Sequence, residues 1–395
     1  MSTAPETQAC PIAANRDDRK SAPLADRFAR PDAGAQRIGN LAFARDILRS
    51  PVARQAGAGA EFVDTGNPEH APVFYLDGAP HRKKRAAIAR FFTPKAVTTR
   101  HRAVMERTTE ALIGELRANG RAQLDEISFR LAVAVAAEIV GLADGDLKKL
   151  SRRIEASLSA ATANRKRGLA GAIAGIGTAS KTAVFYWTEV RPAIRARRKE
   201  RRDDVISHLI DEGYSDRAIL IECMTYGAAG MVTTREFIVM VAWHLFERPD
   251  LVERYLASDD DGQIAILQEI LRLEPVAAMV HRRATEAIET PNGELEAGAL
   301  VALDIRASNT DAASVGACPF AIDPDRAERV KGNGNFLSFG DGGHTCPGWQ
   351  VALHETRIFI DALMRVPGLK LERAPDMTWN SALMSYELRN AIVVC

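Results

Sequence analysis

Apolar residues recur at helical spacing through much of this 395-residue sequence. The clearest runs are Val104–Ala118, Ile127–Leu142, Ala218–Phe246, Ile264–Leu273 and Trp349–Val366. A period near 3.6 places such residues on one helix face, so each run predicts a helix. Shorter strand signals lie at Val280–Ala287, Leu295–Ile305 and Glu387–Val394. The sequence therefore predicts a mainly α fold with small β-sheets, and it shows no alternation of strands and helices.

The chain has no long Pro-, Gly- or Ser-rich linker, although its length would allow two or three domains. Residues 1–25 are polar, and they lack both an apolar signal core and the run of about 20 apolar residues that spans a bilayer. We therefore predict a polar N-terminal tail at 1–25, a single domain at 26–395, and a cytoplasmic protein without a membrane anchor. Between Asp304 and Phe339 the periodicity disappears, which predicts a long functional loop.

Charge and cysteine usage exclude some classes of protein. The chain has 52 Lys and Arg against 51 Asp and Glu, so its near-neutral charge argues against a nucleic-acid-binding protein. One run, Arg195–Arg202, is strongly basic, and such runs are usually the solvated face of a helix. The five cysteines are scattered and odd in number, which makes a disulfide framework or a structural zinc site unexpected and favours a reducing compartment.

One cysteine, Cys346, lies in the glycine-rich segment Phe339–Gly348, directly before the last long helical run. Glycine lets the backbone turn tightly, and Pro347 suits the first turn of a following helix. A thiol placed near free backbone N–H groups and a helix dipole has a lowered pKa, which favours the metal-binding thiolate. The residues alone also allow a buried apolar cysteine, or a nucleophile with His344 as its base.

Residues Phe339–Gly348 match the haem-binding signature Phe-Gly-x-Gly-x-His-x-Cys-x-Gly at every fixed position, so the chain resembles the cytochrome P450 family. The resemblance implies the P450 fold, with haem b between a long distal helix and the proximal cysteine loop. It implies that Cys346 is the axial iron ligand, that Phe339 packs near the sulfur, and that His344 reaches a propionate. The cofactor-binding loop positions are Phe339, Gly340, His344, Cys346 and Gly348.

Two further motifs occur in the family's order. Glu269 and Arg272 match its Glu-x-x-Arg motif, and a spacing of three lets them pair on one helix face. The resemblance makes this pair a buried ion pair of the haem-side core. The family usually adds an arginine near a phenylalanine. Here Phe320 is followed only later by Arg326, so the sequence does not fix this third partner.

Basic residues form a second set of expected cofactor contacts. His81 and Arg85 are four residues apart, on one face of an expected helix that could bind an anion. This helix resembles the propionate-binding helix of the family. The resemblance also makes Arg282 a propionate partner, with Arg283 as its competitor, because a guanidinium can hold a carboxylate in one orientation.

A segment of the long run Ala218–Phe246 resembles the family's distal motif Ala-Gly-x-acid-Thr-Thr. The catalytic positions that this resemblance implies are Ala229, Gly230, Thr233 and Thr234. Thr233 matches the threonine associated with proton delivery to bound dioxygen. Val232 stands where the acid is expected, and valine cannot carry a proton. We therefore hypothesise that Thr233 works with water or a substrate group, that peroxide is used, or that the oxidation needs less relay.

The resemblance implies a haem-thiolate oxidoreductase that inserts oxygen from O2 into a small, largely apolar molecule. Electrons would come from a separate ferredoxin and ferredoxin reductase, and Arg82, Lys83 and Lys84 could attract such an acidic partner. The pocket walls would come from Gly57–Phe74 and Leu158–Tyr186. A peroxide-driven, coupling or dehydrogenating variant is one alternative, and a haem-based sensor or carrier is another.

Overall fold

The computed structural model describes residues 16–23, 34–57, 67–163, 169–380 and 384–395. Its packing divides the chain into two compact units of separated segments. Unit 1 comprises Met1–Glu61, Pro249–Cys346 and Leu383–Tyr386, and unit 2 comprises Phe62–Arg248, Pro347–Ala382 and Glu387–Cys395. The single domain at 26–395 stays a prediction, and most of the predicted tail lies outside the described residues.

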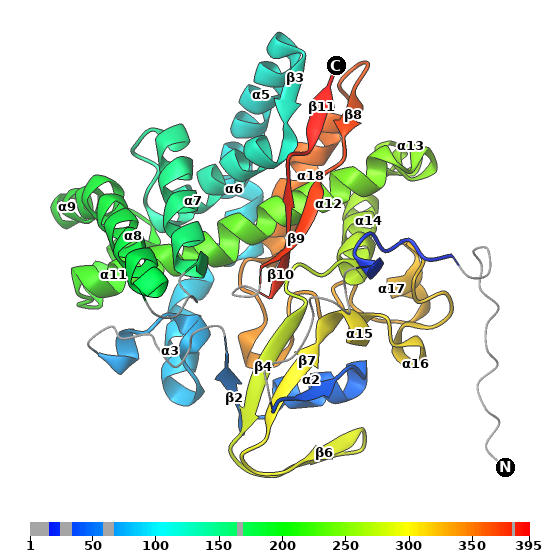
Figure 1. Ribbon diagram of the computed structural model, residues 1–395, viewed down its shortest axis with the longest axis horizontal. Coiled ribbons are helices and arrows are strands. Elements are labelled where there is room, and N and C mark those ends of the chain that lie inside the picture. The colour runs from blue at the N-terminus through cyan, green and yellow to red at the C-terminus, as the bar shows by residue number, and fades with distance from the viewer. Residues whose placement is uncertain (1–15, 24–33, 58–66, 164–168, 381–383) are drawn as a thin grey trace. The chain divides into compact units, whose positions relative to one another are not determined.

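Unit 2 is largely helical (Figure 1). Its α-helices are α3 (Gly78–Ala89), α4 (Pro94–Ala96), α5 (Arg102–Asn119), α6 (Leu124–Val140), α7 (Leu147–Ala163), α8 (Leu169–Phe185), α9 (Arg191–Lys199), α10 (Val205–Asp211), α11 (Asp216–Tyr226), α12 (Thr233–Phe246) and α18 (Trp349–Met364). Its π-helical segments are η5 (Val97–His101), η6 (Tyr186–Val190) and η7 (Gly227–Val232), and its 3-10 turns are η2 (Pro68–His70), η3 (Val73–Tyr75) and η4 (Arg90–Phe92). The core forms around α6, which packs against α5, α7, α12 and η7.

Unit 1 is built on a four-stranded sheet in the order β1–β7–β4–β2. These strands are β1 (Gln36–Ile38), β7 (Leu300–Asp304), β4 (Met279–Ala284) and β2 (Ala53–Ala56). Only the β1–β7 pair is parallel. Figure 1 shows β4 and β7 side by side with α2 (Leu41–Arg49) next to them. Ala44 and Ile47 lie three residues apart on the apolar face of α2. They are therefore buried in a cluster with Val301 and Leu303 of strand β7.

The remaining helices and strands belong to both units. Unit 1 also contains the hairpin β5 (Ile288–Thr290)–β6 (Gly293–Leu295) and the helices α13 (Pro249–Ala257), α14 (Asp260–Leu273), α15 (Ile305–Asn309), α16 (Ala312–Val315), α17 (Arg326–Arg329) and η8 (Gly342–His344). A second sheet has the order β3 (Arg121–Gln123), β11 (Ile392–Val394), β8 (Lys370–Arg373), and β9 (Asp376–Asn380) pairs with β10 (Ser385–Arg389).

The predicted mainly α fold with small sheets is confirmed. All five helical runs are helical, although the run Ala218–Phe246 is interrupted by the π-helical segment η7. The prediction of an irregular stretch between Asp304 and Phe339 was wrong in three short helices. Two of them begin at a capping aspartate: Asp304 accepts from the Ala307 backbone N–H, and Asp311 accepts from that of Ala313.

Two expectations concern compartment and location. Cys318 is disulfide-bonded, whereas the scattered cysteines made disulfides unexpected and favoured a reducing compartment. Cys223, Cys346 and Cys395 form no disulfide. Within the described ranges, no helix combines the length and apolar character that crossing a membrane requires.

Candidate active site

The segment from Phe339 to Cys346 forms a closed turn that presents a thiol. The Cys346 backbone N–H donates to the Phe339 carbonyl oxygen across 2.8 Å, and the Cys346 side chain, which forms no disulfide, is half-buried. Gly340 has a φ of 73°, a left-handed conformation that favours glycine. Helix α18 begins at Trp349, so Pro347 precedes the N-cap and does not occupy the first helical turn as predicted. The backbone therefore fixes where the sulfur is placed.

Asp341 anchors this turn to helix α2. Its carboxylate accepts from Arg45 Nε at 2.9 Å and from Arg49 Nε at 2.8 Å, and it also accepts from the Gly342 backbone N–H. Burial opposes ionisation of Asp341, but the bonds from Arg49 and Gly342 and the charges of Arg49 and Arg45 together outweigh it and hold the pKa of Asp341 below its usual range. A side chain at Gly342 would collide with the Leu48 backbone, so glycine permits this close approach.

A buried ion cluster lies behind the start of the turn. Arg272 donates to both carboxylate oxygens of Glu269, at 2.7 and 2.8 Å, which confirms the predicted pair. Arg326 Nε donates to the same carboxylate at 2.8 Å and supplies the third partner that the sequence left open. Both guanidinium groups are fully buried. Burial costs a charge its hydration, so the cluster depends on all of its bonds being made.

Asn309 connects this cluster to the cysteine turn. Arg272 donates to the Asn309 carbonyl oxygen at 2.8 Å. The Asn309 side chain in turn accepts from the Leu337 backbone N–H at 2.9 Å and donates to Ser338 Oγ at 2.9 Å. Ser338 directly precedes Phe339, so the ion cluster fixes the stem of the turn.

Arg282 and Arg283 point to opposite faces of strand β4. Arg282 is 4% exposed and donates to the His281 carbonyl oxygen, whereas Arg283 is exposed and donates to the Gly298 carbonyl oxygen. The alternation of a strand separates the two candidates. Of these two arginines, Arg282 is therefore the one that faces the interior.

Helix α3 in unit 2 carries the predicted basic pair. His81 is buried and Arg85 is half-buried. The proposed role of Lys84 in attracting a partner is wrong, because Lys84 is only 8% exposed, forms an ion pair with Glu222 and donates to the Ala71 carbonyl oxygen. The charge of Lys84 is paired inside unit 2, and the ion pair with Glu222 joins α3 to α11.

The segment from Ala229 to Thr234 forms an open strip on the distal helix. Thr233 Oγ1 donates to the Ala229 carbonyl oxygen at 2.6 Å, and Thr234 Oγ1 donates to that of Gly230 at 2.7 Å. Ala229 is exposed, Gly230 and Thr233 are half-exposed, and a Cβ on Gly230 would meet no atom within 4 Å. The π-helical segment η7 covers this region, and such segments frequently mark functional sites. The four predicted distal residues therefore lie together, three of them beside open space.

Val232 lies on the opposite side of this turn. It is 6% exposed, and its neighbour Met231 is fully buried. Glu236, one turn further along, is also fully buried, but its carboxylate accepts from the Leu388 backbone N–H and from Arg389. Burial raises the pKa of Glu236, against the opposing charges of Arg235 and Arg389. Because its carboxylate is bonded to Leu388 and Arg389, Glu236 does not supply an acid to the open strip.

Sequence reasoning missed Glu355 on α18. Glu355 is 2% exposed, hydrogen-bonds with Thr234, and within the described residues its second carboxylate oxygen has no partner. Burial raises the pKa of Glu355 well above its usual range, which favours the protonated form of this carboxyl. The available signal was its position, four residues after Val351 and four before Phe359, on the apolar face of the helix.

Phe92 brings three parts of unit 2 together. Its ring stacks on Tyr226 at the end of α11, with 6.4 Å between ring centres, and a Cβ on Gly348 would lie 3.9 Å from it. Burial raises the pKa of Tyr226, and the nearby positive charge of Arg85 opposes that rise. The start of α18, the basic helix α3 and the distal helix therefore converge here.

These features suit haem. In unit 1 the turn presents the Cys346 thiol, which is the ligand that an iron thiolate requires, and strand β4 carries the buried Arg282. In unit 2 helix α3 carries His81 and Arg85, which are basic groups of the kind that bind a propionate. The open strip at Gly230 leaves room beside the distal helix. In the described residues no cluster of three or more His, Cys, Asp and Glu side chains could hold a metal ion.

Comparison with known proteins agrees with this reading. The family model for "Cytochrome P450" matches residues 264–379. The nocardicin C N-oxygenase of Nocardia uniformis subsp. tsuyamanensis is 27% identical over 344 residues, 83% of this chain and 80% of that protein. The cyclomarin C epoxidase CymV of Salinispora arenicola is 29% identical over 301 residues, 73% of this chain and 71% of that protein. The crystal structure of P450BioI in complex with a hexadec-9Z-enoic acid-ligated acyl carrier protein has a TM-score of 0.74 at 21% identity, covering 91% of each chain.

Fold, cysteine turn and comparisons together define a haem-thiolate oxygenase. The matching family model, the relatives and the solved structures are all cytochrome P450s, and by this similarity the chain binds haem b and is a monooxygenase that inserts oxygen into an organic substrate.

Proposed function

We propose that Cys346 supplies the thiolate that holds the haem iron, and that the chain hydroxylates a small, largely apolar molecule. The closed turn from Phe339 to Cys346 is the observation that carries this proposal. Bound haem activates dioxygen, and the protein positions and protonates the reacting atoms. The cofactor-binding residues are His81, Arg85, Arg282, Phe339, Gly340, His344, Cys346 and Gly348.

Ala229, Gly230 and Thr233 form the wall that the substrate contacts. Their exposed surface is small and mainly apolar, which favours an apolar substrate over a charged one. Thr233 Oγ1 holds a proton that it can donate to an oxygen atom in this space, because its present acceptor is only the Ala229 carbonyl oxygen.

Glu355 replaces the missing acid at Val232 in this proposal. Thr234 Oγ1 already donates to the Gly230 carbonyl oxygen, so it offers a lone pair to the protonated Glu355 carboxyl. A proton held on Glu355 is thus one residue away from Thr233 along the distal helix. The buried side chain of Val232 supports the same view, because an acid there would face the packed interior.

Peroxide-driven turnover is the second candidate, and the valine at position 232 is the observation that favours it. The test compares product formed with hydrogen peroxide alone against product formed with O2, ferredoxin, ferredoxin reductase and NADPH. Product only with the reductase system supports the monooxygenase. Product with peroxide at an equal or higher rate supports the variant, and binding of ligands without turnover in either system would indicate a sensor or carrier.

We propose a ferredoxin-type electron donor and a cytoplasmic location. The exposed residues Arg82 and Lys83 remain available to attract an acidic donor. A titration of the haem spectrum with a library of apolar compounds, followed by product analysis, identifies the substrate.

We propose further that the substrate is an acyl chain attached to a carrier protein. P450BioI, one of the similar solved structures, is a complex with such a loaded carrier. The feature of this chain that supports the proposal is a basic surface with an exposed tryptophan on α8, η6 and α9.

A further inference from the structure

Two large apolar side chains are exposed one turn apart at the junction of α8 and η6. Trp187 is 57% exposed and Val184 is 49% exposed, and among the described residues Phe74 is the other large apolar side chain in this class. Arg191 lies over the Trp187 ring at 4.3 Å. Exposure of a large apolar tryptophan ring to water is unfavourable unless a partner covers the ring, so the exposure of Trp187 requires an explanation.

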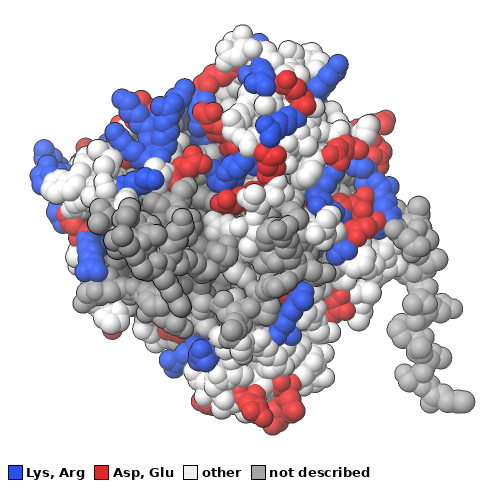
Figure 2. Space-filling view, viewed as in Figure 1, with Lys and Arg blue, Asp and Glu red and all other residues white. Residues whose placement is uncertain are grey.

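The chain around Trp187 is strongly basic. Residues 181–202 contain eight Lys and Arg against two acidic residues. Continuing from Val184 at helical spacing, the side chains of Trp187, Arg191, Arg195 and Lys199 form one stripe, which we call the Trp187 stripe. Figure 2 shows Lys and Arg gathered on the part of the surface that contains α9.

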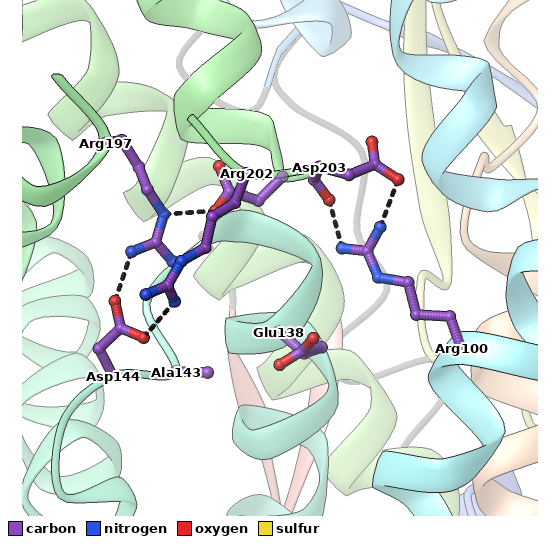
Figure 3. Close-up of a pocket in the computed structure, with 8 residues that line it drawn as sticks. Arg100, Glu138, Ala143, Asp144, Arg197, Arg202 and Asp203 are labelled. Carbon is purple, nitrogen blue, oxygen red and sulfur yellow. Dashed lines mark hydrogen bonds and ion pairs between the residues drawn. The ribbon is translucent and has the colours of Figure 1, made fainter. Parts of the chain in front are cut away.

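Several arginines at the end of α9 are already neutralised, as Figure 3 shows for the cavity they line. Arg197 is 2% exposed and pairs with Asp144 and Asp204. Arg202 also pairs with Asp144. The expectation of a wholly solvated face was therefore wrong at Arg197, which belongs to the interior.

Arg195 and Lys199 differ from those arginines. Both are exposed, and no carboxylate of the described chain pairs with either. Unpaired charges beside an exposed Trp187 give the stripe a positive field and an apolar anchor. An anionic partner would satisfy both features at once.

The chemistry of the stripe favours a protein over a lipid surface. A helix that lies in a bilayer interface presents a long apolar face, whereas among the described side chains of this surface Val184 and Trp187 are the exposed large apolar ones. Tryptophan and arginine are the side chains that dominate protein interfaces. The stripe therefore fits an acidic protein.

The position of the stripe favours a protein that carries substrate over one that carries electrons. Helices α8 and α9 pack mainly on α7, η6 and α10, whereas α18, which follows the cysteine, packs on α5, α12 and η5. Trp187 also follows directly on residues 158–186, which the family resemblance assigns to the pocket wall. A partner on the stripe would thus contact elements that follow the expected pocket wall.

We propose that the Trp187 stripe docks an acidic acyl carrier protein that delivers its apolar acyl chain to the haem pocket. This inference rests on the proposed oxygen insertion into an apolar substrate. Trp187 supplies the apolar anchor, and Arg195 and Lys199 attract the acidic surface of the carrier.

The test measures binding of the haem-loaded full chain to fluorescently labelled acyl carrier protein bearing palmitate, by anisotropy at low and high salt. Reversal of the two unpaired charges (R195E/K199E) is expected to weaken binding at least about tenfold, and Trp187→Ala about tenfold. Added salt is expected to weaken binding of the wild-type protein and to have little effect on R195E/K199E.

The matched control reverses two exposed arginines of α5, R107E/R117E, which have the same change in charge on another helix. We expect its affinity for the loaded carrier to stay within about twofold of wild type. Circular dichroism and haem content of all variants establish that they fold.

Two further arms distinguish other occupants. Equal weakening by both charge reversals, or no binding of the carrier, overturns the proposal. The R195E/K199E variant is also tested for binding to phosphatidylglycerol vesicles and for reduction by ferredoxin. If it still binds the carrier but no longer binds vesicles, the proposal is overturned and the stripe is a lipid surface. If it still binds the carrier but is no longer reduced by ferredoxin, the proposal is overturned and the stripe is an electron-donor surface. Titration of the protein with free palmitate, followed by the haem spectrum, separates failure of the docking proposal from failure of the proposed function. If the docking proposal alone fails, free palmitate still changes the haem spectrum and is oxidised. If the proposed function fails, neither occurs.

Discussion

The cysteine turn of unit 1 and the distal strip of unit 2 are held by different forces. The turn is anchored by charged groups, through Asp341 to Arg45 and Arg49 and through the buried cluster at Glu269. The distal strip is formed by a π-helical segment packed on apolar neighbours, with threonine hydroxyls bonded to their own helix. We infer that the turn is rigid and the strip is chemically adaptable, because ion networks fix one geometry whereas hydroxyl groups can exchange partners.

The largest effect is expected on the turn side. Arg326→Ala leaves Glu269 buried without one of its two cationic partners, so the free energy of unfolding should fall by about 3–5 kcal/mol. Chemical denaturation followed by circular dichroism measures this. Arg329→Ala on the same helix removes a partly exposed partner of Asp323 and should cost about 1 kcal/mol or less. Equal effects of the two substitutions would contradict the anchoring role of the cluster.

On the distal side, Thr233→Ala removes the exposed hydroxyl without disturbing the core. Product formation should fall about 100-fold, because positioned proton transfer contributes at least that much, while O2 consumption continues and hydrogen peroxide accumulates. Oxygen electrode and product assays measure the ratio. Thr225→Ala removes the same type of bond within the helix, from Thr225 Oγ1 to the Ile221 carbonyl oxygen, and should leave coupling unchanged. Tight coupling in the Thr233 variant would exclude it from proton delivery.

Asp341→Asn tests whether charge or shape anchors the turn. The amide keeps the shape but weakens the bonds to Arg45 and Arg49, so haem should dissociate about tenfold faster, as for other groups that orient metal ligands. Transfer of haem to apomyoglobin measures the rate. Asp325→Asn, on an exposed pair with Arg254, provides the control. An unchanged rate in the Asp341 variant would show that the backbone alone holds the turn.

The smallest expected effect is a change in pH dependence at Glu355. Its folded-state pKa is raised by burial, so its contribution to stability is fully present below pH 4.5 and is lost as pH rises toward the raised value. Glu355→Gln cannot ionise, so its free energy of unfolding relative to wild type should increase with pH from about 4.5 upward. A constant difference across that range would show that Glu355 has an ordinary pKa and holds no proton at neutral pH.

The comparison of turn and strip also shows what sequence can predict. The tight turn from Phe339 to Cys346 was predictable because its segment is rich in glycine, and Gly340 takes the left-handed conformation that favours glycine. Arg326 was not, because a side chain 57 residues from Glu269 is brought to it only by the path of the chain. Predicting the helical body required only the apolar period, which does not encode the π-helical segment at Gly227–Val232.

Charged residues account for the other misses. Lys84 and Arg197 lie in basic helical runs that are typical of solvated faces, yet both are buried with carboxylate partners from other helices. Glu355 lies on an apolar helix face, where a single acid among apolar residues was the available signal. Burial of a charge depends on its tertiary partners, so local pattern alone could not predict these positions.

The optical spectrum of the reduced, carbon-monoxide-treated protein tests the bond between Cys346 and haem iron most directly. The wild-type protein should show the long-wavelength Soret band of thiolate-bound haem, and Cys346→Ser should lose that band while the protein remains folded. A wild-type spectrum without the band, or a Cys346→Ser variant that keeps it, would contradict the assignment.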